Sequence, residues 1–189
     1  MTPDPITLEI LFNGLRSVTD EAFIALTRSA YSTNVKTRQD FSCAFLDSEL
    51  RVVAQAFTQA VHLGSFVALV PRAIEIYGVE NLEAGDMLVI NDPYSGGVHL
   101  NDVTVIAPFF LGDGGDGDGE LIGYFASLAH HVDVGGGAPA SLGAFREIFQ
   151  EGIILPPVKL VARGEVDDDI FRLVLAQIRS KTETKGDFR

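Results

Sequence analysis

The stretch that decides the fold is Met87–Phe110, MLVINDPYSGGVHLNDVTVIAPFF, in which two apolar runs enclose a polar segment. Residues 87–90 and 103–110 are apolar and rich in β-branched side chains, so both are predicted to be strands. The polar segment, NDPYSGGVHLND, contains a Tyr-Ser-Gly-Gly turn, then His99 and, three residues later, Asp102. Imidazole and carboxylate are both ordinary metal ligands, and this short spacing can aim both at one ion. The segment is therefore a candidate metal site between two strands.

The rest of the chain predicts a mixture of helices and strands. A long amphipathic helix is expected from about residue 6 to 30, because Asp4-Pro5 provides an N-cap and a first-turn proline before apolar residues at helical spacing. Strands over 41–46 and 51–55 are expected to form a hairpin. The other expected elements are a helix over 64–77 with Pro71 inside it, a strand over 121–131, an edge or irregular strand over 153–161 interrupted by Pro156-Pro157, and a helix over 168–180. No packing element is predicted after residue 180. The predicted class is α+β, with a long N-terminal helix, a mixed or antiparallel sheet and flanking helices.

A glycine- and aspartate-rich segment, residues 112–120, connects two of the predicted strands. Nearly every position in it favours a turn, so we expect a solvated hairpin tip. A calcium loop is the less favoured alternative, because the segment lacks the full ligand pattern of an EF-hand.

Composition and charge exclude several classes of protein. Apolar residues make up 47% of the chain and charged residues 21%, which is typical of a globular protein. The net charge is −12 and no Lys/Arg cluster is present, so nucleic acid is not an expected partner. No apolar run approaches the roughly 20 residues of a membrane span, no signal peptide is visible, and the single cysteine fits a reducing compartment. A cytoplasmic protein without a phosphate-binding GxxxxGK[ST] loop is expected.

The four histidines supply further candidate ligands. His130 and His131 end the predicted strand 121–131, where adjacent residues face opposite sides of the sheet, so only one of them can point into a given site. Two interpretations stay open from the residue pattern alone. The histidines can be hydrogen-bonded polar groups at strand ends, or His99, Asp102 and one of the pair can form a site of two histidines and one carboxylate, a set that suits a catalytic divalent metal.

Two residues near the first predicted hairpin carry alternative interpretations. Asp40, in KTRQDFS, is either a turn or cap carboxylate or a further metal ligand or general base. Cys43 lies in the apolar run DFSCAFLD, where an inert buried thiol is favoured over a nucleophile.

Five segments together resemble the hydantoinase B/oxoprolinase family. They are RSAYSTNVKTRQDFSCAFLD, VAQAFTQAVHLGS, GDMLVINDPYSGGVHLNDVTV, AHHVDVGGGAPAS and FQEGIILPPVKL, in the order expected of that family. The resemblance covers nearly the whole chain, and NDPYSGGVHLND and AHHVDVGG are its most specific parts. Family B components run to several hundred residues, so the resemblance implies that residues 1–189 are the N-terminal, metal-site portion of a larger hydantoinase B-type fold.

The resemblance also implies a ligand set and roles for the surrounding residues. His99, Asp102 and His130 match the family's metal ligands, and Asp40 matches a further ligand or a close neighbour of the site. Asp40 and His131 are assigned to the catalytic group on this basis, and His62 and Asp133 to residues that orient the ligands. Zinc and manganese are both implied as the divalent metal.

The activity implied by the resemblance needs a partner. In this family a hydantoinase A-type subunit, or an A half of the same chain, uses ATP to phosphorylate the amide or enol oxygen of the substrate, and the B component then processes the activated intermediate. We therefore expect a hetero-oligomeric, metal-dependent cyclic amidase of the hydantoinase or 5-oxoprolinase type, which hydrolyses a lactam or imide ring. A subunit of an ATP-dependent ketone carboxylase of the acetone or acetophenone type is the first alternative. A non-catalytic scaffold fragment is the second.

Overall fold

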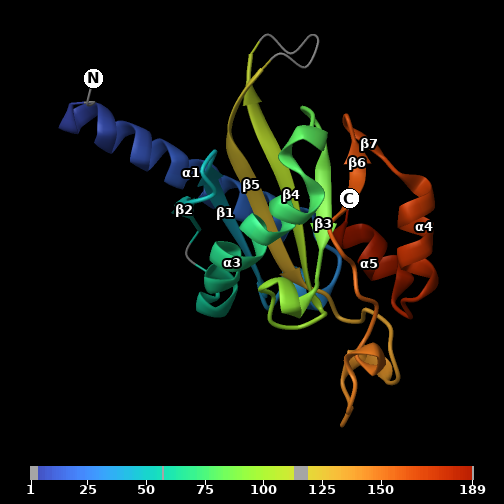
Figure 1. Ribbon diagram of the computed structural model, residues 1–189. Coiled ribbons are helices and arrows are strands. Elements are labelled where there is room, and N and C mark those ends of the chain that lie inside the picture. The colour runs from blue at the N-terminus through green and yellow to red at the C-terminus, as the bar shows by residue number, and fades with distance from the viewer. Residues whose placement is uncertain (1–3, 57, 113–118, 189) are drawn as a thin grey trace.

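A single antiparallel sheet organises the protein. The computed structural model describes residues 4–56, 58–112 and 119–188 (Figure 1). Within these ranges seven strands form the sheet in the order β2-β1-β5-β4-β3-β6-β7, and every neighbouring pair is antiparallel. The strands are β1 (Phe41–Asp47), β2 (Val52–Gln55), β3 (Met87–Ile90), β4 (Asp102–Leu111), β5 (Glu120–His130), β6 (Val158–Ala162) and β7 (Glu165–Val166).

Helices cover both faces of this sheet. They are α1 (Pro5–Ser29), α2 (Thr33–Lys36), α3 (Ala60–Tyr77), α4 (Asp168–Ala176) and α5 (Lys181–Asp187). On one face α3 packs against β1, β3, β4 and β5, and this contact forms the main hydrophobic core (Figure 1). On the other face, α1 and α2 pack beside β1 and β5, α4 packs beside β3 and β6, and α5 contacts α4 and the turn between α1 and α2. The predicted α+β class, with a long N-terminal helix and flanking helices, is confirmed.

Strand alternation assigns each residue of β4 and β5 to one of the two cores. Ile106 and Leu128 point into the core under α3, whereas Val103 and Ala129 point to the opposite face. Because successive side chains in a strand face opposite sides, Asp102 and His130 share the α3 side and His131 faces the other.

The early elements agree with the predictions, with one shift. α1 and the β1–β2 hairpin lie where they were expected, and the Asp4 carboxylate caps α1 by accepting from the Ile6 and Thr7 amides at 3.0 and 3.1 Å. α3 begins at Ala60, four residues before the predicted start, and it continues through Pro71. A proline inside a helix removes one backbone hydrogen bond. The helix persists because residues on both sides of it, including Val70 and Ala73, are fully buried against the sheet.

The C-terminal third differs more from the predictions. The strand expected over 153–161 is regular only from Val158, because the preceding prolines lack the N–H that a ladder needs. The helix expected over 168–180 ends at Ala176, and a separate helix, α5, follows. The expectation of no packing element after residue 180 is therefore wrong. α5 has the polar sequence KTETKGD, which carries no apolar periodicity, and it is held by contacts of Asp187 and Phe188 with distant parts of the chain.

The connection between β4 and β5 falls mostly outside the described residues. Residues 113–118 are not described, so the hairpin-tip and calcium-loop interpretations of residues 112–120 both stay predictions.

α3 is long and apolar enough to cross a membrane by length and composition alone. Seven of its residues, among them Phe66 and Leu69, are buried within the protein. This burial is what a core helix requires, and it explains the high apolar content of α3 without a bilayer.

Candidate metal centre

The register of β4 and β5 brings two of the predicted ligands together. Asp102 and His130 are directly opposite each other at the end of the antiparallel pair. Directly opposed residues share a face of the sheet and lie about 5 Å apart, so both side chains point to the α3 side. Asn101 holds this end of the pair closed: its carbonyl accepts from the His131 amide at 2.8 Å, and its Nδ2 donates to the His131 carbonyl at 2.9 Å.

The loop NDPYSGGVHLND delivers His99 to the same place. Asn91 is fully buried and anchors the loop, because its Nδ2 donates to the Leu100 carbonyl at 2.7 Å and its Oδ1 accepts from the Leu155 amide at 2.7 Å. Gly96 has a φ of +109°, and a Cβ there would lie 2.8 Å from the backbone nitrogen of Leu69 in α3. Only glycine therefore lets the loop pass this close to α3.

The Asp102 carboxylate lies between two imidazole rings. Its Oδ1 is 2.6 Å from Nδ1 of His130, and its Oδ2 is 3.0 Å from Nδ1 of His99. The same Oδ2 accepts a hydrogen bond from the His99 backbone amide at 3.0 Å. Asp102 is fully buried, His130 is partly buried and the His99 side chain is 60% exposed, so the cluster opens to solvent on the His99 side.

These contacts shift the proton affinities of the cluster in opposite directions. Burial alone would raise the pKa of Asp102, but the hydrogen bond with His130, the charge of His130 and the His99 amide lower it below its ordinary value. Burial alone would lower the pKa of His130, but the hydrogen bond with Asp102 and the charges of Asp102 and Asp40 raise it. The site therefore favours a carboxylate that faces positive charge.

Asp40 and His62 complete the polar surroundings of Asp102. The Asp40 carbonyl accepts from the His130 amide at 2.9 Å, which places Asp40 beside the end of β5. Nε2 of His62 lies 3.7 Å from Oδ1 of Asp40 and 3.9 Å from Oδ1 of Asp102. Burial lowers the pKa of His62, and the charges of Asp102 and Asp40 oppose that effect only in part. A neutral His62 that carries its proton on Nε2 presents a donor to the two carboxylates, which only accept.

His99, Asp102 and His130 offer one ligand atom each within 4.8 Å of one another. Two imidazole nitrogens and a carboxylate are a donor set that fits a transition metal and leaves coordination positions open. In each short contact between Asp102 and a ring nitrogen, one atom carries a proton that a divalent ion would displace. The chemistry of these donors therefore fits the expected metal. Asp40 lies next to this trio through His62 and is not part of it.

The structure does not bring the other two predicted site residues into the cluster. His131 points to the opposite face, where its ring stacks on Phe188 with centroids 4.8 Å apart and its Nδ1 has no hydrogen-bond partner. Asp133 is buried in the following loop, where its carboxylate accepts from the Gly135 and Ala140 amides and from Arg179. Neither the catalytic role expected for His131 nor the ligand-orienting role expected for Asp133 has support from these contacts.

Two hydroxyl groups near the cluster had no signal in the sequence. Ser42 Oγ lies 3.3 Å from Nδ1 of His62 and accepts a hydrogen bond from Thr58 Oγ1 at 2.6 Å. The hydrogen bonds from Thr58 to Ser42 and between Ser42 and His62 orient the His62 ring toward the two carboxylates. Single serine and threonine residues have no distinctive spacing in a sequence. The role of Ser42 and Thr58 becomes visible only when β1 and the segment before α3 are seen side by side in the structure.

The burial of His131 predicts a pH-dependent contribution to stability. Burial lowers the pKa of His131 to about 4, against the effect of the nearby Asp187 charge. A histidine whose pKa is depressed on folding stabilises the fold above its unfolded pKa, and this contribution is lost as pH falls toward the folded value. Between pH 7 and pH 4, unfolding of the wild type should become easier by about 3 kcal/mol through this group.

His131→Phe is expected to remove the pH-dependent contribution of His131 to the unfolding free energy, because phenylalanine cannot be protonated. The phenylalanine ring should keep the stacking on Phe188. Urea unfolding of both proteins across pH 4 to 7 would measure the difference in unfolding free energy, which should move in favour of the variant as pH falls. Parallel curves would show that His131 is not a buried neutral imidazole.

The fold and the cluster define a class: an α+β protein with a His–Asp–His site at one end of an antiparallel sheet. The family model for hydantoinase B/oxoprolinase matches residues 4–189. The chain belongs to the hydantoinase B/oxoprolinase family, which confirms the resemblance drawn from its motifs.

Several curated relatives are similar to almost the whole chain. The uncharacterised protein MJ0963 of Methanocaldococcus jannaschii is 40% identical over 189 residues, which cover 98% of this chain and 32% of that protein. 5-Oxoprolinase 1 of Arabidopsis thaliana is 36% identical over 96% of this chain and 14% of its own length. Caprolactamase subunit beta of Pseudomonas jessenii is 31% identical over 98% of this chain and 31% of its own length. The chain thus spans about a third or less of these relatives.

Two solved structures share the fold. The ATP-dependent caprolactamase of Pseudomonas jessenii superposes with a TM-score of 0.89 at 30% identity, covering all of this chain and 31% of that one. An acetone carboxylase superposes with a TM-score of 0.88 at 22% identity, covering 98% of this chain and 24% of that one. These matches confirm the fold as a portion of a larger one.

Proposed function

We propose that this chain is the metal-site component of an ATP-dependent cyclic amidase, which opens a lactam or imide ring after a partner subunit has activated it. The observation that carries the proposal is the placement of Asp102 between His99 and His130 at one end of the sheet. Family membership and similarity to a 5-oxoprolinase and a caprolactamase subunit support the substrate class. We further propose that residues 1–189 form the metal-site portion of a hydantoinase B-type domain.

His99, Asp102 and His130 would hold the ion, and the donor set suits zinc and manganese alike. When bound, a divalent ion there would act as a Lewis acid, activating water and stabilising negative charge on oxygen. Asp102 contributes the buried charge that attracts a cation, and the His99 amide fixes the orientation of that carboxylate. The exposed His99 ring leaves the solvent side open for a substrate.

Asp40 is the residue that we propose for proton transfer. Its side chain is one-third exposed, whereas Asp102 is fully buried, so Asp40 can exchange a proton with water or with a bound substrate. The His62 ring, which contacts Ser42 through Nδ1, lies between the two carboxylates, with Nε2 at 3.7 Å from Asp40 and 3.9 Å from Asp102. This arrangement assigns the two aspartates different tasks, in which Asp102 holds charge and Asp40 moves a proton.

The proposed partner follows from family membership and from the similarity to a caprolactamase subunit. We propose a hydantoinase A-type subunit that uses ATP to phosphorylate the amide oxygen, so that the active species is a hetero-oligomer. The buried, unpaired thiol of Cys43 agrees with a reducing compartment, and we propose the cytoplasm.

Reconstitution with an A-type subunit tests this function. With ATP, a loaded metal and 5-oxoproline or caprolactam, the complex should release ring-opened amino acid and ADP in equal amounts. Asp40→Asn should lower the rate of ring opening by about a hundredfold, the usual loss for a general base, while the metal content is unchanged. Liquid chromatography of the product and metal analysis of the same sample measure both quantities.

Other results would assign different roles. Loss of metal together with activity in Asp40→Asn would make Asp40 a ligand. Product formation from a ketone that requires bicarbonate would assign the chain to the carboxylases. Absence of both reactions, with a partner that still binds after loss of His99 and Asp102, would support the scaffold alternative.

A further inference from the structure

The first half of α1 extends past the sheet (Figure 1), and an apolar stripe on it is largely exposed. Leu8, Leu11, Leu15 and Val18 recur at spacings of three and four residues, so they line one side of the helix. Leu8 and Leu11 are each more than half exposed. Continued at the same spacing, the stripe reaches Ala22 and Leu26, which pack on the sheet in the cluster around Phe41. The stripe is thus covered by the sheet at Ala22 and Leu26, and it is bare toward the start of the helix at Leu8 and Leu11.

The sheet ends beneath this bare half. β2 is the outermost strand, and among the described strands it pairs only with β1. Its other backbone edge is therefore available for pairing with a further strand. Strands in a sheet lie about 4.8 Å apart, so a strand added beside β2 would continue the sheet under the overhanging part of α1.

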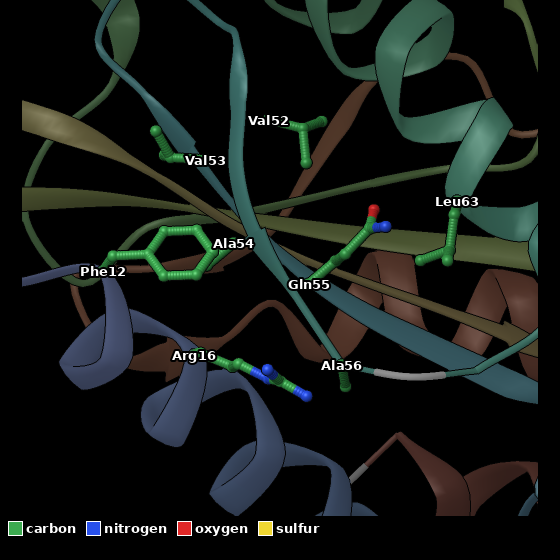
Figure 2. A pocket seen from close by; sticks show the side chains of 8 residues that line it. All are labelled: Phe12, Arg16, Val52, Val53, Ala54, Gln55, Ala56 and Leu63. Atoms are coloured by element: carbon green, nitrogen blue, oxygen red, sulfur yellow. The ribbon is translucent and has the colours of Figure 1, made fainter. Parts of the chain in front are cut away.

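A groove already follows this edge. It has a volume of about 430 Å³ and is lined by Phe12 and Arg16 of α1, by all four residues of β2 with the following Ala56, and by Leu63 of α3. Figure 2 shows β2 between side chains that come from α1 on one side and from α3 on the other. The floor of the groove is the strand edge, and its walls are the two helices that cover opposite faces of the sheet. This shape fits an extended segment better than a compact ligand.

We propose that this groove is the docking site for an apolar β-strand from the part of a hydantoinase B-type polypeptide that lies outside the region matched by this chain. The relatives supply the reason for this occupant. MJ0963 and caprolactamase subunit beta are about three times as long as the matched region, and the caprolactamase fold continues beyond the superposed part. A second copy of this chain is disfavoured, because it would bring together two chains that each carry a net charge of −12.

The binding mode is strand addition. Backbone hydrogen bonds to the edge of β2 would provide affinity, and the stripe on α1 would select alternate apolar side chains of the added strand. The proposal rests on family membership and on this surface. It does not depend on the metal centre, because His99, Asp102 and His130 are not among the residues that line the groove.

Co-expression tests the proposal. The tagged full chain would be produced together with the part of MJ0963 outside its matched region, and the eluted material would be analysed by light scattering after gel filtration. A one-to-one complex is expected, with slowed hydrogen exchange at the amides of Val52–Gln55. Leu8→Asp combined with Leu11→Asp should weaken the complex at least tenfold, because both side chains would become charged in an apolar contact.

The same helix supplies a matched control. Ile6 and Ile10 are also exposed, but they lie on the side opposite the stripe. Ile6→Asp combined with Ile10→Asp should therefore leave the complex intact, while circular dichroism reports helix content for both double variants. No complex on co-expression, or equal binding by both double variants, would overturn the proposal. A homodimer of the chain alone that the Leu8 and Leu11 changes abolish would assign the groove to a second copy and would overturn it too.

Discussion

Replacing Asp102 by asparagine is expected to abolish stoichiometric metal binding. The wild type should take up about one zinc or manganese ion per chain, and the variant should bind more than about a hundredfold more weakly, which exceeds the usual loss for residues that only support ligands. The reason is the position of Asp102, whose two oxygens contact the His130 and His99 rings at 2.6 and 3.0 Å. Asparagine keeps the shape but removes the charge and one acceptor. Mass spectrometry of metal content and calorimetric titration would measure the change.

A control for this substitution lies ten residues away. Asp92 belongs to the same loop and caps the short turn Pro93–Ser95 by accepting from the Tyr94 amide at 3.0 Å. Because asparagine is an equally good cap, Asp92→Asn should bind metal like the wild type. Circular dichroism would show that Asp102→Asn is folded. Unchanged metal binding in Asp102→Asn would contradict the prediction. It would show that His99, Asp102 and His130 form a hydrogen-bond network and not a metal site.

Asp133→Ala should destabilise the fold by about 1–3 kcal/mol, the usual effect of leaving buried hydrogen-bond donors without an acceptor. The Asp133 carboxylate is almost fully buried, and it accepts hydrogen bonds from the amides of Gly135, Ala140 and Arg179 and from the Arg179 guanidinium. Alanine would leave three backbone amides without their acceptor, whereas the Arg179 guanidinium would keep its hydrogen bonds to the Gly135, Gly136 and Ala138 carbonyls. Denaturation in urea, followed by circular dichroism, measures the loss.

The same variant separates two roles of Asp133. If the carboxylate acts only in folding, as its contacts indicate, the folded fraction of Asp133→Ala should bind metal at the wild-type ratio. The exposed Asp20, on α1, offers a comparison, and Asp20→Ala should change the unfolding free energy by less than about 0.5 kcal/mol. A stable Asp133→Ala that binds no metal would restore the ligand-orienting role.

The sequence was sufficient for the elements that build the site, because their signals are local. The period of two in residues 121–131 separates His130 from His131, and the turn before His99 follows from Tyr-Ser-Gly-Gly. The structure confirms that His130 and His131 face opposite sides and that His130 lies opposite Asp102. The length and position of α1 were predictable for the same reason, since its cap and apolar spacing lie within one segment.

Features that depend on distant contacts could not be predicted in this way. The role of Asp133 depends on Arg179, 46 residues later, and α5 is held through Asp187, which accepts from the Tyr31 amide. The order of the strands in the sheet could not be predicted from the sequence either, because β1 pairs with β5, which follows it by nearly half of the chain. His62 approaches Asp102 only because α3 packs across that sheet.

The direct opposition of Asp102 and His130 makes the site a property of strand register. Moving either strand by one residue against the other would carry one of the two side chains to the opposite face, and the site would be lost as a whole rather than weakened. The β4–β5 connection lies at the other end of β4, ten residues away and about 30 Å from Asp102. A change of length within β4 or β5 is therefore expected to be more destructive to the site than a substitution at the same position.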